Sequence, residues 1–106
     1  MLISTMNDVP GYDVTEVLGE VFGLTVRSRN AASQLGSQLR SVFGGELKGM
    51  TQALTDSRIQ VIERMVEEAT AKGVDAVLAM RFDTSEIGTA WTEICAYGTA
   101  VKVEKS

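Results

Sequence analysis

The chain of 106 residues contains no histidine, one cysteine and one proline. Without histidine the commonest general base is absent, and no Ser-His-Asp or Cys-His arrangement can form. Catalysis by Glu, Lys or Tyr stays an alternative, but no pattern of these residues points to an activity. The single cysteine, Cys95, excludes an intramolecular disulfide and is typical of a reducing compartment. We therefore expect a cytoplasmic protein that is not an enzyme.

Long hydrophobic runs and clusters of basic residues are absent as well. No run of about 18 uncharged apolar residues occurs, so no transmembrane helix is expected. The start of the chain lacks the basic segment and apolar core of a signal peptide. Ten Lys and Arg are scattered among fourteen Asp and Glu, for a formal net charge of −4. Nucleic acids and anionic membranes both bind clustered basic surfaces, so we expect neither as a partner.

The composition is that of one ordinary globular domain. Hydrophobic residues make up 44% of the chain and charged residues 23%, which argues against a disordered protein. The length suits a single domain over residues 1–106 with one modest core.

The central feature of the sequence runs from Thr51 to Thr84 and predicts a long amphipathic helix, a stop at Gly73 and a buried strand. At 3.6 residues per turn, the apolar residues of the helix form a stripe roughly 140–160° wide. These residues are Leu54, Val61, Ile62, Met65, Val66 and Ala69, with Ile59 at the edge of the stripe. The stripe is wider than a helix on a single surface requires. Glycine suits the left-handed position just after a helix.

The strand predicted over Asp75–Thr84 has apolar residues on both of its faces. One face carries Leu78, Met80 and Phe82, and the other carries Val77 and Ala79. A strand of this kind is covered on both faces, at least in its first half.

The rest of the chain predicts three more strands and a second helix. A short strand is expected over Leu2–Thr5, and a long strand over Tyr12–Val26 with a bulge or bend at Gly19 and Gly23. A helix follows from Ser28 or Asn30 to Phe43. The last strand covers Ala90–Val103, after a hairpin loop at Ser85–Thr89. Apart from the short strand over Leu2–Thr5, the order is strand, helix, helix, strand, strand. This order predicts an α+β fold, with two helices packed on a small antiparallel or mixed sheet.

The two-sided strands and the wide helical stripe also predict self-association. Two helices from a short chain can cover one face of a three-stranded sheet, and large exposed apolar patches are unusual on monomers. Another copy of the same chain, in a closed ring or a dimer, is the simplest cover for the remainder.

Several short motifs occur in an order that resembles the YbjQ-like family. They are Gly44-Gly45-Glu46, Ser57-Arg58, Lys72-Gly73-Val74-Asp75-Ala76-Val77, Met80-Arg81-Phe82-Asp83 and Tyr97-Gly98-Thr99-Ala100-Val101. This uncharacterised bacterial and archaeal family is often described as a "putative heavy-metal-binding domain", and the resemblance extends from Ser4 to Val103. It implies a fold like the dodecin subunit, assembled as a homopentameric ring. Met50 departs from the pattern, because the family usually carries a tyrosine there; a ligand contact made by that hydroxyl would be lost.

The family description makes a metal site the first candidate. Soft metals need thiolates and imidazoles at defined spacings. This chain offers only Cys95, which lies in mid-strand among apolar residues, where cysteine usually behaves as a small hydrophobe. Five cysteines around a ring axis could still form a site. Asp83 and Glu86 could bind a hard cation, but without a recognisable motif. We expect no heavy-metal site, with Cys95 as the weak candidate.

The glycine pair before the long helix has two interpretations. Gly44-Gly45-Glu46 could cradle an anion at a helix N-terminus, but neither a Walker pattern nor GxGxxG is present. We favour a sharp turn between helices that requires positive φ.

Charged and aromatic residues are the remaining candidates. Arg81 and Asp83 share a parity on a mostly apolar strand, and Arg58 interrupts the apolar stripe of the long helix. Ion pairs across a subunit interface are the favoured role, and contact with a ligand is the alternative. Trp91 and Tyr97 share a strand face and could stack a planar ligand, although packing in a core or interface is favoured.

These observations predict a homo-oligomer that binds a small molecule or ion between its subunits. No particular cofactor is indicated. A structural or scaffolding oligomer that presents its surface to protein partners is the second hypothesis, and heavy-metal binding is the third.

Overall fold

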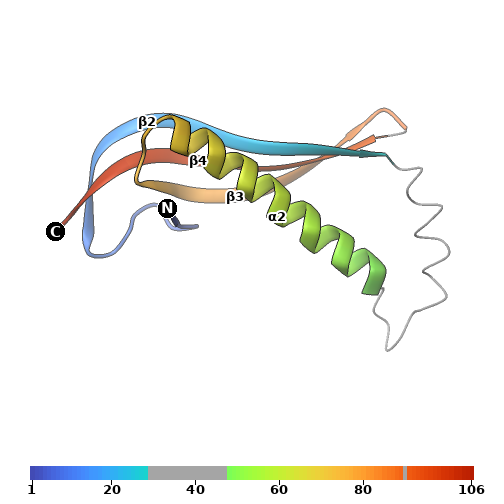
Figure 1. The fold of residues 1–106 in the computed structure, drawn as a ribbon, viewed down its shortest axis with the longest axis horizontal. Coiled ribbons are helices and arrows are strands. Elements are labelled where there is room, and N and C mark those ends of the chain that lie inside the picture. Colours follow the sequence, from blue (N-terminus) through green and yellow to red (C-terminus); the bar gives the residue numbers. More distant parts are fainter. Residues whose placement is uncertain (29–47, 90) are drawn as a thin grey trace.

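The computed structural model describes residues 1–28, 48–89 and 91–106 (Figure 1). These residues form strands and a helix in the order β1 (Leu2–Ile3), β2 (Tyr12–Ser28), α2 (Lys48–Ala71), β3 (Ala76–Ile87) and β4 (Trp91–Lys105). The strands make one mixed sheet in the order β1-β3-β4-β2, in which β1 is parallel to β3 and the other pairs are antiparallel. The α+β class with a mixed sheet is therefore confirmed, whereas the described residues place one helix on the sheet rather than the predicted two.

The described elements lie close to their expected bounds. α2 ends just before Gly73, whose φ of 71° is the left-handed value expected there. β3 continues beyond the predicted end at Thr84 to Ile87, so the hairpin turn is tighter than predicted. The helix predicted up to Phe43 and the turn at Gly44-Gly45-Glu46 lie outside the described residues. Along the described part of the chain, no helix combines the length and apolarity needed to cross a membrane.

α2 lies across one face of the sheet, and the main core fills the space between them (Figure 1). The core residues include Val21, Val61, Met65, Ala69, Val77, Ile94, Ala96 and Ala100. Val61, Met65 and Ala69 are fully buried, which confirms the middle of the predicted stripe. Leu54, which belongs to the same stripe, is 53% exposed, and Ile59, at the edge of the stripe, is 51% exposed.

Within residues 1–28, 48–89 and 91–106, the opposite face of the sheet is covered at one end. There Leu78 and Val101 are buried, and Val9 packs against them. Val9 belongs to residues 1–11, which precede β2 and which we call the N-terminal segment. The segment is held to β3 by backbone hydrogen bonds, among them one of 2.8 Å from the N–H of Ala79 to the carbonyl of Met6. The first half of β3 is thus covered on both faces, as the sequence predicts.

A bulge in β3 corrects the predicted faces of that strand. The register with β4 shifts between Leu78 and Arg81, and Ala79 has a φ of 52°. Leu78 therefore belongs to the small second core, whereas Met80 and Phe82 pack against the main core beside α2. The prediction that Leu78 shares a face with Met80 and Phe82 was wrong, because a bulge inverts the alternation of side chains.

Two glycines in β2 have different roles. Gly19, with a φ of 100°, lies at a register shift, which confirms the predicted bulge. Gly23 lies in an unbroken part of the ladder, so no bulge occurs there. A Cβ atom at this position would collide with backbone atoms of Val61 and Met65. Gly23 therefore allows α2 to approach β2 closely.

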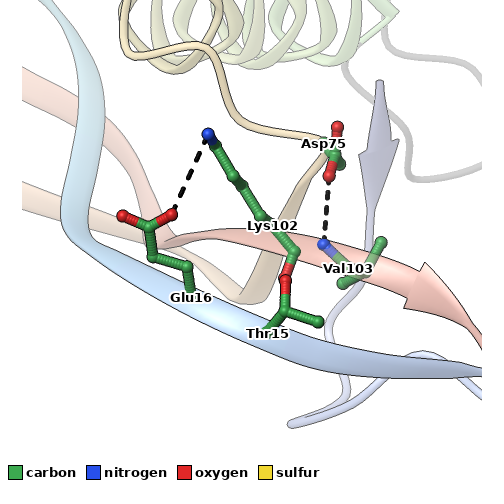
Figure 2. Close-up of polar contacts among 5 residues, drawn as sticks. All are labelled: Thr15, Glu16, Asp75, Lys102 and Val103. Carbon is green, nitrogen blue, oxygen red and sulfur yellow. Dashed lines mark hydrogen bonds and ion pairs between the residues drawn. The ribbon is translucent and has the colours of Figure 1, made fainter.

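A group of polar contacts joins β2, β4 and the start of β3 at the covered end of the sheet (Figure 2). The N–H of Val103 donates to Oδ2 of Asp75 at 3.0 Å. Nζ of Lys102 lies 3.8 Å from Oε2 of Glu16. Thr15, at the register shift just before Glu16, donates from Oγ1 to the carbonyl of Lys102 at 3.3 Å. These contacts join the ends of the strands to one another, so we assign this region a structural role.

Candidate functional site

The candidate site is the part of the sheet that faces away from α2 and lies beyond the N-terminal segment. We call it the open face. Its members follow from the alternation of side chains along each strand and from the registers of β4 with its two neighbours. They are Phe22, Leu24, Val26, Arg81, Asp83, Ser85, Ile87, Trp91, Glu93, Cys95 and Tyr97. All are exposed except Glu93 and Cys95, which are half-buried.

Large apolar side chains dominate the open face. Six of them are each 36–48% exposed, namely Phe22, Leu24, Val26, Ile87, Trp91 and Tyr97. The first three follow one another along the same face of β2, and Tyr97 on β4 lies directly opposite Phe22. A row of adjacent apolar side chains on an exposed surface marks a site of interaction rather than ordinary surface.

One row across the open face combines two aromatic rings with a guanidinium. Tyr97 lies opposite Phe22 on one side and opposite Arg81 on the other. Nη1 of Arg81 donates hydrogen bonds of 2.8 Å to the carbonyls of Thr5 and Met80. These bonds hold the arginine at the border between the open face and the N-terminal segment. The guanidinium has further N–H donors on its other nitrogens.

The next row contains the only thiol. Cys95 lies opposite Leu24 on one side and opposite Asp83 on the other. Burial raises the pKa of the Cys95 thiol, and the carboxylates of Glu93 and Asp83 raise this pKa further. The thiol is therefore protonated at neutral pH, and it is the thiolate that binds soft metals. Among the residues that the structure describes, no group of three or more His, Cys, Asp or Glu side chains is placed to hold a metal ion.

Trp91 lies at the far end of the open face. It pairs with Ile87 across the β3–β4 hairpin, on the same face as Tyr97 as predicted. Six residues of strand separate Trp91 from Tyr97, which is roughly 20 Å at 3.4 Å per residue. The two rings cannot sandwich one planar ligand within a single chain.

Arg58 lies on α2, on the other side of the sheet. Its guanidinium carbon stands 4.9 Å from the centroid of the Phe82 ring, a cation–π contact. The structure thus separates Arg58 from Arg81: Arg58 is exposed on α2 and lies over Phe82, on the helix side of the sheet rather than on the open face.

The open face brings together four predicted site residues, Arg81, Asp83, Trp91 and Tyr97, along with the weak metal candidate Cys95. Sequence reasoning missed the β2 side of this surface. Its signal was present in the alternation of Phe22, Leu24 and Val26, but their exposure could not be known before α2 was placed on the other face.

Comparison with known proteins places the chain in a family. The family model YbjQ_1, described as "Putative heavy-metal-binding", matches residues 1–104. A UPF0145 protein of Acidothermus cellulolyticus is 66% identical over 105 residues, which cover 99% of this chain and 97% of the relative. The UPF0145 protein SCO3412 of Streptomyces coelicolor is 57% identical over 105 residues, which cover 99% of each chain.

A solved structure shares the fold. It is the crystal structure of a protein of unknown function from Pediococcus pentosaceus that belongs to the DUF74 family. The similarity covers 98% of each chain, with a TM-score of 0.59 and 15% sequence identity. At this identity the likeness shows the fold alone.

Proposed function

Since the chain belongs to the UPF0145 family, whose family model is described as "Putative heavy-metal-binding", we propose that it is a self-assembling binding protein. Copies of the chain join so that their open faces are covered, and the assembly encloses a site for a small molecule or ion. The proposed assembly is the homopentameric ring of dodecin-like subunits that the family resemblance implies. The protein acts in the cytoplasm and is not an enzyme.

The observation that carries this proposal is the exposure of the open face. Six large apolar side chains in neighbouring positions are 36–48% exposed on a chain whose other sheet face is packed beneath α2. Removal of apolar surface from water contributes about 25 cal/mol per Å², against which the entropic cost of association counts. The apolar row along β2 therefore supports association with another copy. Leu54 and Ile59, exposed on α2, add apolar surface outside the open face.

The chemistry of the open face supports a planar organic anion as the ligand. Phe22 and Tyr97 offer aromatic surface, and Arg81 in the same row offers a permanent positive charge. Both hydrogen bonds from Arg81 to backbone carbonyls use Nη1, so this nitrogen holds the guanidinium in place. A ligand held between subunits would pack on the rings and accept hydrogen bonds from the guanidinium.

Native mass spectrometry tests this proposal on protein purified without chelators and without a histidine tag. We expect the mass of five chains with an additional mass for each subunit, and Arg81→Gln should lose the additional mass while keeping the assembly. A five-chain assembly without additional mass would support the scaffold hypothesis instead. A monomer at micromolar concentration would refute the assembly.

A pair of variants tests whether the open face is the surface involved. Leu24→Lys places a charge in the apolar row of the open face, and we expect it to reduce the assembly to smaller species. Val17→Lys is the matched control, because Val17 is 65% exposed on the same strand and the same side of the sheet but lies outside the open face, opposite Val101 near the covered end. Equal effects of the two variants would contradict the assignment of the surface.

Heavy-metal binding is the second candidate function, supported by the family description. Cys95 is its only thiol, and a ring would bring several copies of it together. The raised pKa of Cys95 opposes this function, since a metal would first have to displace the proton. Metal retained in stoichiometric amount by the wild type, and lost in Cys95→Ser, would favour it over the organic ligand.

A further inference from the structure

A regular row of side chains from α2 covers the outer edge of β2. Among the strands that the structure describes, β2 has a neighbour, β4, on one side only, so every second residue turns its backbone N–H and C=O outward. In order along the helix, the contacts are Gln60 Oε1 with Arg27 Nη2 (3.1 Å), Arg64 Nη1 with the carbonyl of Leu24 (2.6 Å), Glu68 Oε2 with the N–H of Phe22 (3.2 Å) and Lys72 Nζ with the carbonyl of Glu20 (3.2 Å).

The geometry of the two elements explains the regularity. The four residues of α2 are spaced four apart, so they lie in one row with steps of about 6 Å along the helix axis. The contacted positions of β2 from Glu20 to Leu24 are spaced two apart, with steps of about 6.7 Å. The two repeats match closely, and the contacts run in opposite directions along the two elements. Arg64 and Lys72 donate to backbone carbonyls, and the carboxylate of Glu68 accepts from a backbone N–H. Each of these contacts therefore pairs a donor with an acceptor.

Gly23 places the row within reach of the strand. A Cβ atom there would lie 2.8 Å from Cβ of Arg64 and would collide with the helix backbone. The glycine thus lets α2 lie close enough for Arg64 and Glu68 to reach the edge beside it. The other edge of the sheet differs. Along the described residues, β1 pairs with β3 only at Ala76 and Val77.

We propose that Gln60, Arg64, Glu68 and Lys72 form an edge guard, an autoinhibitory contact that prevents β2 from pairing with a strand of a second copy. Unpaired strand edges are templates for the addition of another chain. With the guard in place, copies meet through side chains of the open face and not through the backbone of β2. The choice of a second copy as the partner rests on the proposed self-assembly. The guard itself rests on the three contacts with the backbone of β2, which the side-chain contact of Gln60 with Arg27 extends by one helical turn.

The test compares two double variants of the full chain. Arg64→Ser with Glu68→Ser removes the centre of the guard and leaves the net charge at −4, because one positive and one negative charge are lost. Glu63→Ser with Glu67→Ser is the control on exposed positions of the same helix, and it changes the net charge from −4 to −2. The smaller net charge of the control reduces repulsion between copies and so favours its association. If the guard variant still associates more than the control, net charge is not the cause.

Light scattering after size exclusion and thioflavin T fluorescence are the readouts for both variants and the wild type. We expect the guard variant to form larger, thioflavin-positive species that increase with concentration, and the control to keep the mass of the wild type. A guard variant with wild-type mass and fluorescence would overturn the proposal. A monomeric wild type would refute the proposed assembly without affecting this comparison, so the two failures are distinguishable.

Amide hydrogen exchange keeps the proposal testable if the double variant folds poorly. Glu68→Ser should speed exchange at the N–H of Phe22 about ten-fold, the loss expected for a hydrogen bond to a carboxylate. Glu68→Gln retains an oxygen acceptor, so it should restore most of the protection and remain free of large species. Unchanged exchange in Glu68→Ser would show that the contact does not hold the edge and would overturn the guard.

Discussion

The α-carbon of Gly23 in β2 lies so close to the backbone carbonyl of Val61 in α2 that no side chain fits between them. This approach sets the distance between helix and sheet along the main core, where Val61 and Met65 are fully buried. The same approach brings Arg64 to the carbonyl of Leu24 at the strand edge. One position without a side chain therefore supports both the core and the polar contacts beside it.

Gly23→Ala should be strongly destabilising. The added methyl group would meet backbone atoms of the helix, which cannot move away as a flexible side chain can. We expect a loss of about 3 kcal/mol in the free energy of unfolding, measured by urea denaturation. Gly88→Ala is the control, because nothing lies within 4 Å of its added Cβ and only its φ of 61° opposes alanine. That control should lose about 1 kcal/mol. Similar losses in both variants would contradict the close approach.

Ala79→Gly should stabilise the protein. Ala79 has a φ of 52° at the bulge of β3, a conformation that glycine adopts without strain. Relief of this strain exceeds the added entropy of the unfolded chain, so we expect a gain of about 0.5 kcal/mol. Ala79→Val should lose about 2 kcal/mol, since a branched side chain is poorly tolerated at positive φ. Thermal unfolding of both variants gives the comparison, and a stabilising valine would contradict the bulge geometry.

The stability contributed by Cys95 should decrease at alkaline pH. Its pKa is raised in the folded protein, first by burial and then by Glu93 and Asp83. The folded state therefore holds the thiol proton more tightly than the unfolded state, so the contribution is complete below the unfolded pKa and is lost as pH rises through the folded pKa. The difference in unfolding free energy between wild type and Cys95→Ser should shrink from pH 7 to pH 10. A constant difference would mean that the pKa is the same in both states.

The polar contacts at the covered end of the sheet should differ in how much they contribute to the free energy of unfolding. Asp75→Ala removes the acceptor for the N–H of Val103, and we expect a loss of about 1 kcal/mol. Asp75→Asn keeps an oxygen acceptor and should lose less. Lys102→Met breaks the ion pair with Glu16. Because the side chains of Lys102 and Glu16 are 46% and 58% exposed, this variant should change stability by less than about 0.5 kcal/mol. Chemical denaturation ranks the three variants, and a larger loss for Lys102→Met than for Asp75→Ala would reverse this interpretation.

Sequence reasoning was most successful where the signal is local. The helical stripe around Val61 and Met65, the stop at Gly73 and the bulge at Gly19 all depend on neighbouring residues, and the structure contains each of them. The parity of Arg81 and Asp83 was also correct, because no bulge separates them. The predicted roles of Arg58, Arg81 and Asp83 at a subunit interface stay predictions.

The failures arose where one inserted residue changes every later position. Alternation alone assigns Leu78, Met80 and Phe82 to one face, but the bulge at Ala79 moves Leu78 to the other. Alternation also predicts that Trp91 and Tyr97 share a face without showing that roughly 20 Å of strand lies between them. Gly23 resembled a bulge in the sequence, whereas the structure uses it for contact with a helix nearly forty residues further on.

The sequence by itself determined the α+β class, the amphipathic helix that ends before Gly73, and the absence of histidine-based chemistry, because composition and short-range periodicity are sufficient for each. Only the tertiary structure decided that Tyr97 stands between Phe22 and Arg81, and that Glu68 reaches the edge of β2. These relationships join residues far apart in the chain, and their register depends on how a bulge and a glycine bring whole elements together.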